Sequence, residues 1–296
     1  MLDVNQLLQS MVTGVGVGLI YGLVGIGFCV IYNASGIVNF AQGVFVMLGG
    51  MFAHAVMTRL GVPLILAAII AVPLVAGAGM LMERLVVRPM WDRKATLFAI
   101  VLATLATQIM IERIMLLTLG DQPRSIPPFT DGGPLRLGAI AVGYQLFWIL
   151  GGGAVLVTLL WLFFTRTTTG RALRACSQNR EAAAQLGIPV GRMLAISFAL
   201  SAALGAIAGI LVTPTQYTAY NVGGPFGVNG FIAAIIGGFG NAGGALAGGI
   251  LLGLAQSIAI VVFGAGFKNV AALSLLLLVL LVFPSGLFGS RDGKGH

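Results

Sequence analysis

Seven long apolar runs, each close to the length that a helix needs to cross a bilayer, dominate this sequence. A hydrocarbon core about 30 Å thick requires about 20 apolar residues in a helical segment. The runs lie at 11–32, 36–58, 62–83, 95–118, 144–165, 193–213 and 268–288. Inside lipid every backbone polar group must be satisfied within the protein, and at this length a helix satisfies them. The sequence therefore predicts an all-α polytopic membrane protein.

A further apolar stretch, 228–263, is 36 residues long and is interrupted by glycine. This length is too great for one ordinary span and short for two. The interruptions are Gly237, Gly238, Gly240, Gly243 and Gly244. We expect two short or discontinuous helices that meet near Asn241, which gives eight or nine membrane segments in total.

Charged residues are too few to cover a soluble surface. They make up 8% of the chain, whereas a soluble domain carries about 25%. Lipid removes the need for a charged exterior, and the 44 glycines allow membrane helices to approach closely. Because no long polar stretch interrupts the apolar runs, the sequence predicts a single transmembrane domain over residues 1–296.

Positive charges are concentrated where they indicate the orientation of the chain in the membrane. Eleven of the 16 Lys and Arg residues lie in the loops 84–94 and 166–192 and at Arg291 and Lys294 in the tail. Such clusters mark cytoplasmic segments. This places the N-terminus outside and the C-terminus in the cytoplasm if 228–263 crosses twice, giving nine crossings; eight, with one re-entrant segment, is the alternative. Nothing in the charge distribution indicates a nucleic-acid partner. We expect the outer surface of the helices to contact membrane lipid.

The loop 166–192 is long enough to contain helices of its own. Asn179 is suited to cap a short helix, Glu181 stabilises its first turn through the helix dipole, and Gly187 is suited to end it. Ala182, Ala183 and Leu186 then form a small apolar face with little to pack on in the same chain. We interpret this as a face for a partner's groove; a solvated loop that only sets topology is the alternative.

Three motifs in this order resemble the permease subunits of branched-chain amino acid ABC importers, over nearly the whole chain. The first is Gly36-Ile37-Val38-Asn39-Phe40-Ala41-Gln42-Gly43. The second is Gly170-Arg171-Ala172-Leu173-Arg174-Ala175, followed by Asn179 and Glu181-Ala182-Ala183, and the third is Gly237-Gly238-Phe239-Gly240-Asn241. The resemblance implies an ABC importer type II-like permease bundle in a bacterial inner membrane. It also implies that the region from Gly170 to Gly187 docks on a cytoplasmic ATPase.

The same resemblance implies the partners of the chain. They are a second, homologous permease subunit, two cytoplasmic ATPase subunits and an extracytoplasmic solute-binding protein. ATP would be bound by the ATPases, and this chain would bind no cofactor or metal and would not be an enzyme. The coupling residues implied are Gly170, Arg171, Arg174, Asn179, Glu181, Ala182, Ala183 and Gly187.

A weak internal echo links the two halves of the chain. Gly36-Ile37-Val38-Asn39-Phe40-Ala41 compares with Gly227-Val228-Asn229-Gly230-Phe231-Ile232-Ala233. Paired glycine-interrupted segments are typical of inverted-repeat transporters, whose path runs along the repeat interface. The echo then predicts that Asn39, Gln42, Asn229 and Asn241 face the translocation pathway. The alternative is chance recurrence in a glycine-rich chain.

An ion-coupled secondary transporter of small polar solutes is the alternative function. It requires an ionisable residue within the membrane that binds the coupling ion. We interpret Glu112-Arg113 as an anchor at the end of a span and His54 as a packing residue, which counts against ion coupling. No catalytic or metal-binding set is present in the sequence. Within the resembled family the solute stays open among branched-chain amino acids, urea, short amides and aromatic acids.

Overall fold

Eight helices in the structure, a computed structural model that describes residues 4–137 and 140–289, are long and apolar enough to cross a membrane. The helices of these spans are α1 (Val4–Ser35), α2 (Gln42–Leu60), α3 (Leu64–Met82), α5 (Leu97–Leu119), α6 (Tyr144–Arg166), α9 (Val190–Gln216), α11 (Ala242–Phe263) and α12 (Lys268–Val282), the last together with the helical turn at 265–267. The prediction of an all-α membrane protein is confirmed.

Shorter elements join these helices. They are the π-helix η1 (Glu83–Val87), α4 (Arg88–Asp92), the antiparallel strands β1 (Leu135–Leu137) and β2 (Ile140–Val142), α7 (Thr168–Gln178), α8 (Arg180–Gln185), α10 (Gly223–Gly237) and the 3-10 helix η2 (Ala265–Phe267). The chain continues from α3 through η1 and α4 as one helical segment of 29 residues. Much of the loop predicted at 84–94 is therefore helical.

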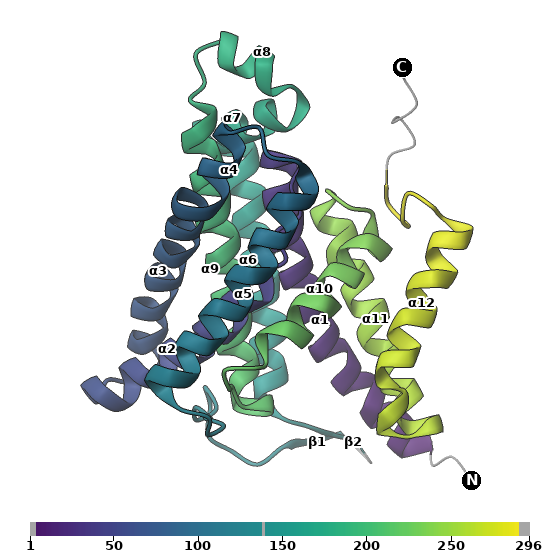
Figure 1. The fold of residues 1–296 in the computed structure, drawn as a ribbon. Helices are drawn as coiled ribbons and strands as arrows, with labels where there is room; N and C mark the ends of the chain where they lie inside the picture. The colour runs from purple at the N-terminus through teal and green to yellow at the C-terminus, as the bar shows by residue number, and fades with distance from the viewer. Residues whose placement is uncertain (1–3, 138–139, 290–296) are drawn as a thin grey trace.

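The two ends of the bundle carry different elements (Figure 1). Helices α7 and α8 lie at one end and the β1–β2 hairpin at the other, while α1 begins at the hairpin end and α12 ends at the α7–α8 end. Opposite ends for the start and finish of the chain agree with the charge-based topology. The tail residues Arg291 and Lys294 lie outside the described residues.

The glycine-interrupted stretch forms two helices, as predicted, although only α10 is short. Helix α10 has 15 residues and α11 has 22. Helices α9 and α11 both pack antiparallel to α1, with Ser201 beside Gly27 and Gly253 beside Gly14. The segment 217–222 and α10 therefore carry the chain back between them, and the described chain passes along the bundle nine times.

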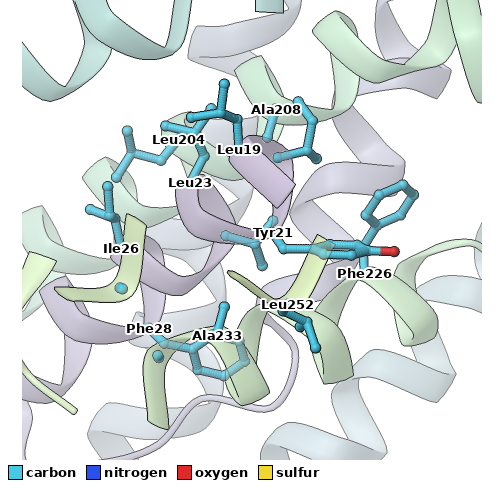
Figure 2. Packing of buried hydrophobic residues seen from close by; sticks show 14 of the residues in the cluster. Leu19, Tyr21, Leu23, Ile26, Phe28, Leu204, Ala208, Phe226, Ala233 and Leu252 are labelled. Atoms are coloured by element: carbon cyan, nitrogen blue, oxygen red, sulfur yellow. The ribbon is translucent and has the colours of Figure 1, made fainter. Parts of the chain in front are cut away.

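Helix α1 is the central element of the packing. Of its most apolar 18 residues, 89% are buried, against 11% of the segment Ala265–Val282 that contains α12. Tyr21 and Phe28 pack on Phe226 and Phe231 of α10, and Leu252 of α11 belongs to the same cluster (Figure 2). A helix apolar on all sides is expected to lie at the centre of a bundle, and the outer helices then face lipid.

Glycines allow α11 to pack directly on the backbone of α1. A Cβ added to Gly249 would overlap backbone atoms of Gly18 and Gly22, and one added to Gly253 would overlap Gly14 and Gly18. Close backbone contact of this kind replaces the hydrophobic effect as the attraction between membrane helices. The four-residue glycine spacing thus fixes α11 against the centre of the bundle.

Candidate functional site

The loop 166–192 folds into two helices packed on the end of the bundle. In α7, Thr167 Oγ1 accepts a hydrogen bond from Gly170 N at 2.9 Å. Gly170 is buried, and a Cβ there would overlap the Phe163 carbonyl at the end of α6. Leu173 and Cys176 are also buried, in a cluster with residues of α1 and α9. Arg171 and Arg174 are exposed.

The ends of α8 are those that the sequence predicted. Asn179 Oδ1 accepts a hydrogen bond from Ala182 N at 3.0 Å, which satisfies one of the free amides of the first turn. Glu181 lies in that turn and is exposed. Gly187 has φ of +80°, a left-handed conformation that glycine adopts without strain. Caps at both ends give this six-residue helix defined limits.

The apolar face predicted for α8 is divided between two directions. Ala183 is buried against its own chain, in the cluster that contains Leu173 and Cys176. Leu186, in contrast, is 81% exposed, and Ala182 is exposed too. The prediction that Ala183 has little to pack on is therefore wrong. Ala183 attaches α8 to the bundle, and Leu186 is the apolar side chain left for a partner; the coupling role of the loop stays a prediction.

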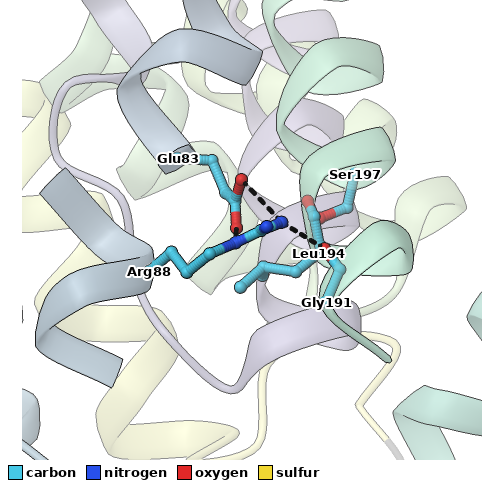
Figure 3. Close-up of polar contacts among 5 residues, drawn as sticks. All are labelled: Glu83, Arg88, Gly191, Leu194 and Ser197. Atoms are coloured by element: carbon cyan, nitrogen blue, oxygen red, sulfur yellow. Dashed lines mark hydrogen bonds and ion pairs between the residues drawn. The ribbon is translucent and has the colours of Figure 1, made fainter. Parts of the chain in front are cut away.

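An ion pair between buried Glu83 of η1 and partly exposed Arg88 of α4 contacts α9 beside this loop (Figure 3). Glu83 is 0% exposed, and Arg88 Nε donates a hydrogen bond to Glu83 Oε1 at 3.0 Å. Arg88 Nη2 also donates to the Gly191 carbonyl at the start of α9, at 2.8 Å. The wide turn of η1, in which Arg88 N bonds to the Glu83 carbonyl, places the two side chains together. This link was not predicted, because residues 84–94 were expected to form a loop.

A cation–π contact adds a second link at this end of the bundle. The Arg180 guanidinium lies 4.8 Å from the ring centroid of Trp91, which joins α8 to α4. Arg180 and Arg88 line one cavity together with Gly191. The α8 helix and the α4 end of the α3–α4 segment are thus joined through side chains as well as through α9.

Replacing Arg88 with Met is expected to lower the free energy of unfolding by about 3 kcal/mol. The change leaves the carboxylate of Glu83 buried without its partner, and breaking a buried pair costs about 3–5 kcal/mol; Arg88 is partly exposed, which favours the lower value. Thermal unfolding in detergent measures the loss. The double variant Arg88→Met with Glu83→Gln should recover most of it, and a single variant as stable as the original chain would contradict the role of the pair.

Two helices begin inside the bundle, each after an irregular segment. Residues 36–41 precede α2, which starts six residues later than the predicted span 36–58, and 217–222 precede α10. A Cβ on Gly43 would overlap the carbonyl of Gly223 and the amide of Gly227. The first turns of α2 and α10 are therefore in backbone contact. Irregular backbone at membrane depth is tolerated where protein buries it or where it lines a cavity.

The amides predicted to line the pathway occupy three different places. Gln42 is buried, with Nε2 donating to the Ser201 carbonyl at 3.1 Å, and Asn39 Oδ1 accepts from Ala41 N at 3.1 Å. Asn39 Nδ2 is buried without a hydrogen-bond partner in the described part of the chain. These two residues lie together at the break before α2.

Asn229 and Asn241 lie elsewhere. Asn229, on α10, accepts a hydrogen bond from Gln256 Nε2 of α11 at 2.7 Å, and both are buried. Asn241 is exposed and caps α11 through the amide of Gly244, at 3.0 Å. The echo in the sequence does not align the two breaks, because Gly227 to Ala233 lie within α10. The pathway role of the four amides stays a prediction. Gln256, a lone amide in an apolar run, was not among the predicted residues, although it is buried and bonds to one of them.

The sequence matches known proteins over nearly its whole length. The family model described as "Branched-chain amino acid transport system / permease component" matches residues 10–284. The chain is 32% identical to the high-affinity branched-chain amino acid transport system permease protein BraD of Pseudomonas aeruginosa, covering 98% of both chains. It is 31% identical to the corresponding protein LivH of Escherichia coli K12, covering 96% of both.

A solved structure has a similar fold. "PsaBC from Streptococcus pneumoniae in complex with Fab" matches with a TM-score of 0.52 at 14% identity, over 94% of this chain and 92% of that one. At this identity the likeness concerns the fold alone. The helices follow one another as expected, and the sequence match over residues 10–284 includes the glycine-interrupted segments. These observations lead to one conclusion. The chain belongs to the family of branched-chain amino acid transport system permease components, and is a permease subunit of an ABC importer.

Proposed function

We propose that this permease moves branched-chain amino acids, delivered by an extracytoplasmic binding protein, into the cytoplasm. A second homologous permease subunit completes the passage, and two separate ATPase subunits supply the energy. The match of the family model over residues 10–284 carries the proposal. The relatives that match over nearly their full length are named as branched-chain amino acid permeases, which supports this choice of cargo.

In this proposal α7 and α8 dock on the ATPases at the cytoplasmic end of the bundle. The exposed Leu186 and the exposed charges of Arg171, Arg174 and Glu181 support this position. The basic character of the loop supports a cytoplasmic location for that end, which places the start of α1 outside and the end of α12 inside. ATP is bound by the partner subunits, and this chain binds no cofactor.

The contacts of α7 and α8 provide a route for movement into the bundle. Leu173 and Cys176 transmit it to α1 and α9, and Arg180 transmits it through Trp91 to the α3–α4 segment. ATP-driven closure of the ATPases moves the docked helices, and the bundle changes the side on which the passage is open. The first turns of α2 and α10, in backbone contact at Gly43 and Gly223, lie within the part of the bundle that this change would rearrange.

Reconstitution tests this proposal. The complex of both permeases and both ATPases is placed in proteoliposomes with the loaded binding protein outside, and leucine uptake is measured with and without ATP. We expect uptake only with ATP and the ATPases. Uptake driven by a proton or sodium gradient, with this chain and no ATPase, would contradict the proposal in favour of a secondary transporter.

A further inference from the structure

The connection from α5 to β1 is attached to four helices at the hairpin end of the bundle. Ile126 is 2% exposed, in a cluster with residues of α2, α3 and α9. Phe129 N donates a hydrogen bond to Gln145 Oε1 in the first turn of α6, at 3.3 Å. Residues 120–134, called the strap below, are therefore packed on the bundle rather than free of it.

Arg124 joins the strap to the irregular segment 217–222, which leads into α10. Arg124 N donates a hydrogen bond to the Thr218 carbonyl at 2.8 Å, and Thr218 N donates one to the Arg124 carbonyl at 2.7 Å. The guanidinium donates through Nη2 to the Leu119 carbonyl at the end of α5, and its Nη1 lies 3.5 Å from His54 Nδ1 of α2. Thr218 is 2% exposed. One residue of the strap thus contacts α5, α2 and the segment before α10.

The segment held by this bridge contains a strained residue. Tyr217 has φ of +50° and ψ of 170°, a conformation that residues with a Cβ adopt only at a cost in free energy. Its side chain is 55% exposed, so burial of the ring does not offset that cost. The residue is instead held from both sides, since its own N bonds to the Thr213 carbonyl of α9 and the next residue, Thr218, bonds to Arg124. Backbone strain of this kind is concentrated at sites that switch conformation.

The bridge between Arg124 and Thr218 is easier to break than the rest of the strap. It is an isolated pairing of one residue with one residue, outside any strand. Arg124 Nε is buried without a hydrogen-bond partner in the described part of the chain, so the guanidinium is incompletely satisfied in the bridged state. Breaking the bridge relieves Tyr217 and gives Nε access to water, whereas removing Ile126 from its cluster would expose apolar surface.

We propose that the Arg124–Thr218 bridge is an outer latch, which holds the start of α10 while the passage is closed to the outside and breaks each time it opens there. The proposal rests on the proposed function, which places the hairpin end of the bundle outside. A Cβ on Gly43 of α2 would overlap the Gly223 carbonyl, so the first turn of α10 lies against α2 in the bridged state. Breaking the bridge frees 217–222, and with it this first turn, to move away from α2.

Access to position 218 from outside tests whether the latch opens. Thr218→Cys in the full complex is treated with a maleimide that does not cross the membrane, at rest and during ATP hydrolysis with the loaded binding protein. Hydrolysis should speed the labelling several-fold, because each opening exposes the buried position. The matched control is Ile126→Cys, which is equally buried at 2% on the packed part of the strap and should not label faster. An unchanged rate at position 218, or an equal rise at position 126, would overturn the proposal.

A reversible disulfide across the bridge tests whether transport requires its release. Antiparallel residues that exchange both hydrogen bonds have Cα atoms about 5.5 Å apart, which suits a disulfide. Arg124→Cys with Thr218→Cys is oxidised by copper phenanthroline in the complex, and leucine uptake is measured before and after reduction by dithiothreitol. Oxidation should abolish ATP-driven uptake in the double variant alone, and reduction should restore it.

Equal uptake by the oxidised and reduced double variant would overturn the latch and leave the proposed function intact. Failure of the original chain to take up leucine with ATP would count against the proposed function instead. The labelling of Thr218→Cys during ATP hydrolysis would then still decide whether the bridge opens.

Discussion

Replacing Leu186 with Asp should abolish the binding of the ATPase subunits while the chain still folds and inserts. Leu186 is 81% exposed directly after α8, whereas the neighbouring Ala183 is buried in the same chain. An apolar side chain so exposed at the end of the bundle that is proposed to dock is suited to fill a groove in the partner. A carboxylate in that groove would be desolvated without a partner. Loss of a central contact costs about 2 kcal/mol, so affinity should fall by about 30-fold or more.

Co-purification of the ATPases with the permease measures this effect. The matched control is Leu60→Asp, which makes the same change at a 64% exposed leucine that is the last residue of α2. Helix α2 ends away from the end of the bundle that carries α7 and α8. The control should bind the ATPases normally. Leu186→Asp that retains the ATPases in full would remove α8 from the docking surface. Size-exclusion profiles of both variants show whether folding is intact.

Replacing Gly249 with Val should prevent formation of the folded bundle. A Cβ at this position would overlap backbone atoms of Gly18 and Gly22 in α1, which no side-chain rotation relieves. Overpacking a well-packed core costs about 1–3 kcal/mol even where side chains can adjust, and backbone overlap costs more. Because α1 is the central helix, moving α11 away would open the core along much of its length. The amount of monodisperse protein after extraction in detergent is the measurement.

Gly151→Val provides the control for this variant. Gly151 lies on α6, is exposed, and has no other group within 4 Å of the position that a Cβ would take. The same substitution there should yield normal amounts of folded protein. If both variants were equally well folded, close glycine contact between α1 and α11 would not be what holds these helices together.

Most of the fold was predictable because lipid imposes a simple length rule on apolar runs. The predicted runs became helices, and the glycine-broken stretch became α10 and α11. The start of α2 was not predictable in this way. Residues 36–41 are as apolar as the membrane helices that flank them, yet they are not helical. Asn39 Oδ1 accepts a hydrogen bond from Ala41 N, and Thr104 of α5 accepts one from Phe40 N. A local bond and a tertiary contact thus delay the start of α2. The π-helix η1 depends similarly on a partner, because Arg88 bonds to Gly191 on α9.

The candidate site was likewise predictable where it depends on neighbouring residues and not where it depends on other helices. Local rules predicted the caps of α8 at Asn179 and Gly187, since capping depends on residues close in sequence. The burial of Ala183 and the pairing of Asn229 with Gln256 depend on other helices and could not be predicted.

The coupling of α8 to an ATPase is tested most directly by a cross-link from the end of this helix. Leu186→Cys is labelled with a photoreactive maleimide in the assembled complex. The native Cys29 and Cys176 are each 1% exposed, and burial raises the pKa of the Cys176 thiol, so both react poorly. Illumination should join this chain to an ATPase subunit, and a label at Leu60→Cys should not. An ATPase that stays bound to the complex yet never cross-links to position 186 would contradict the claim that this loop couples the passage to ATP hydrolysis.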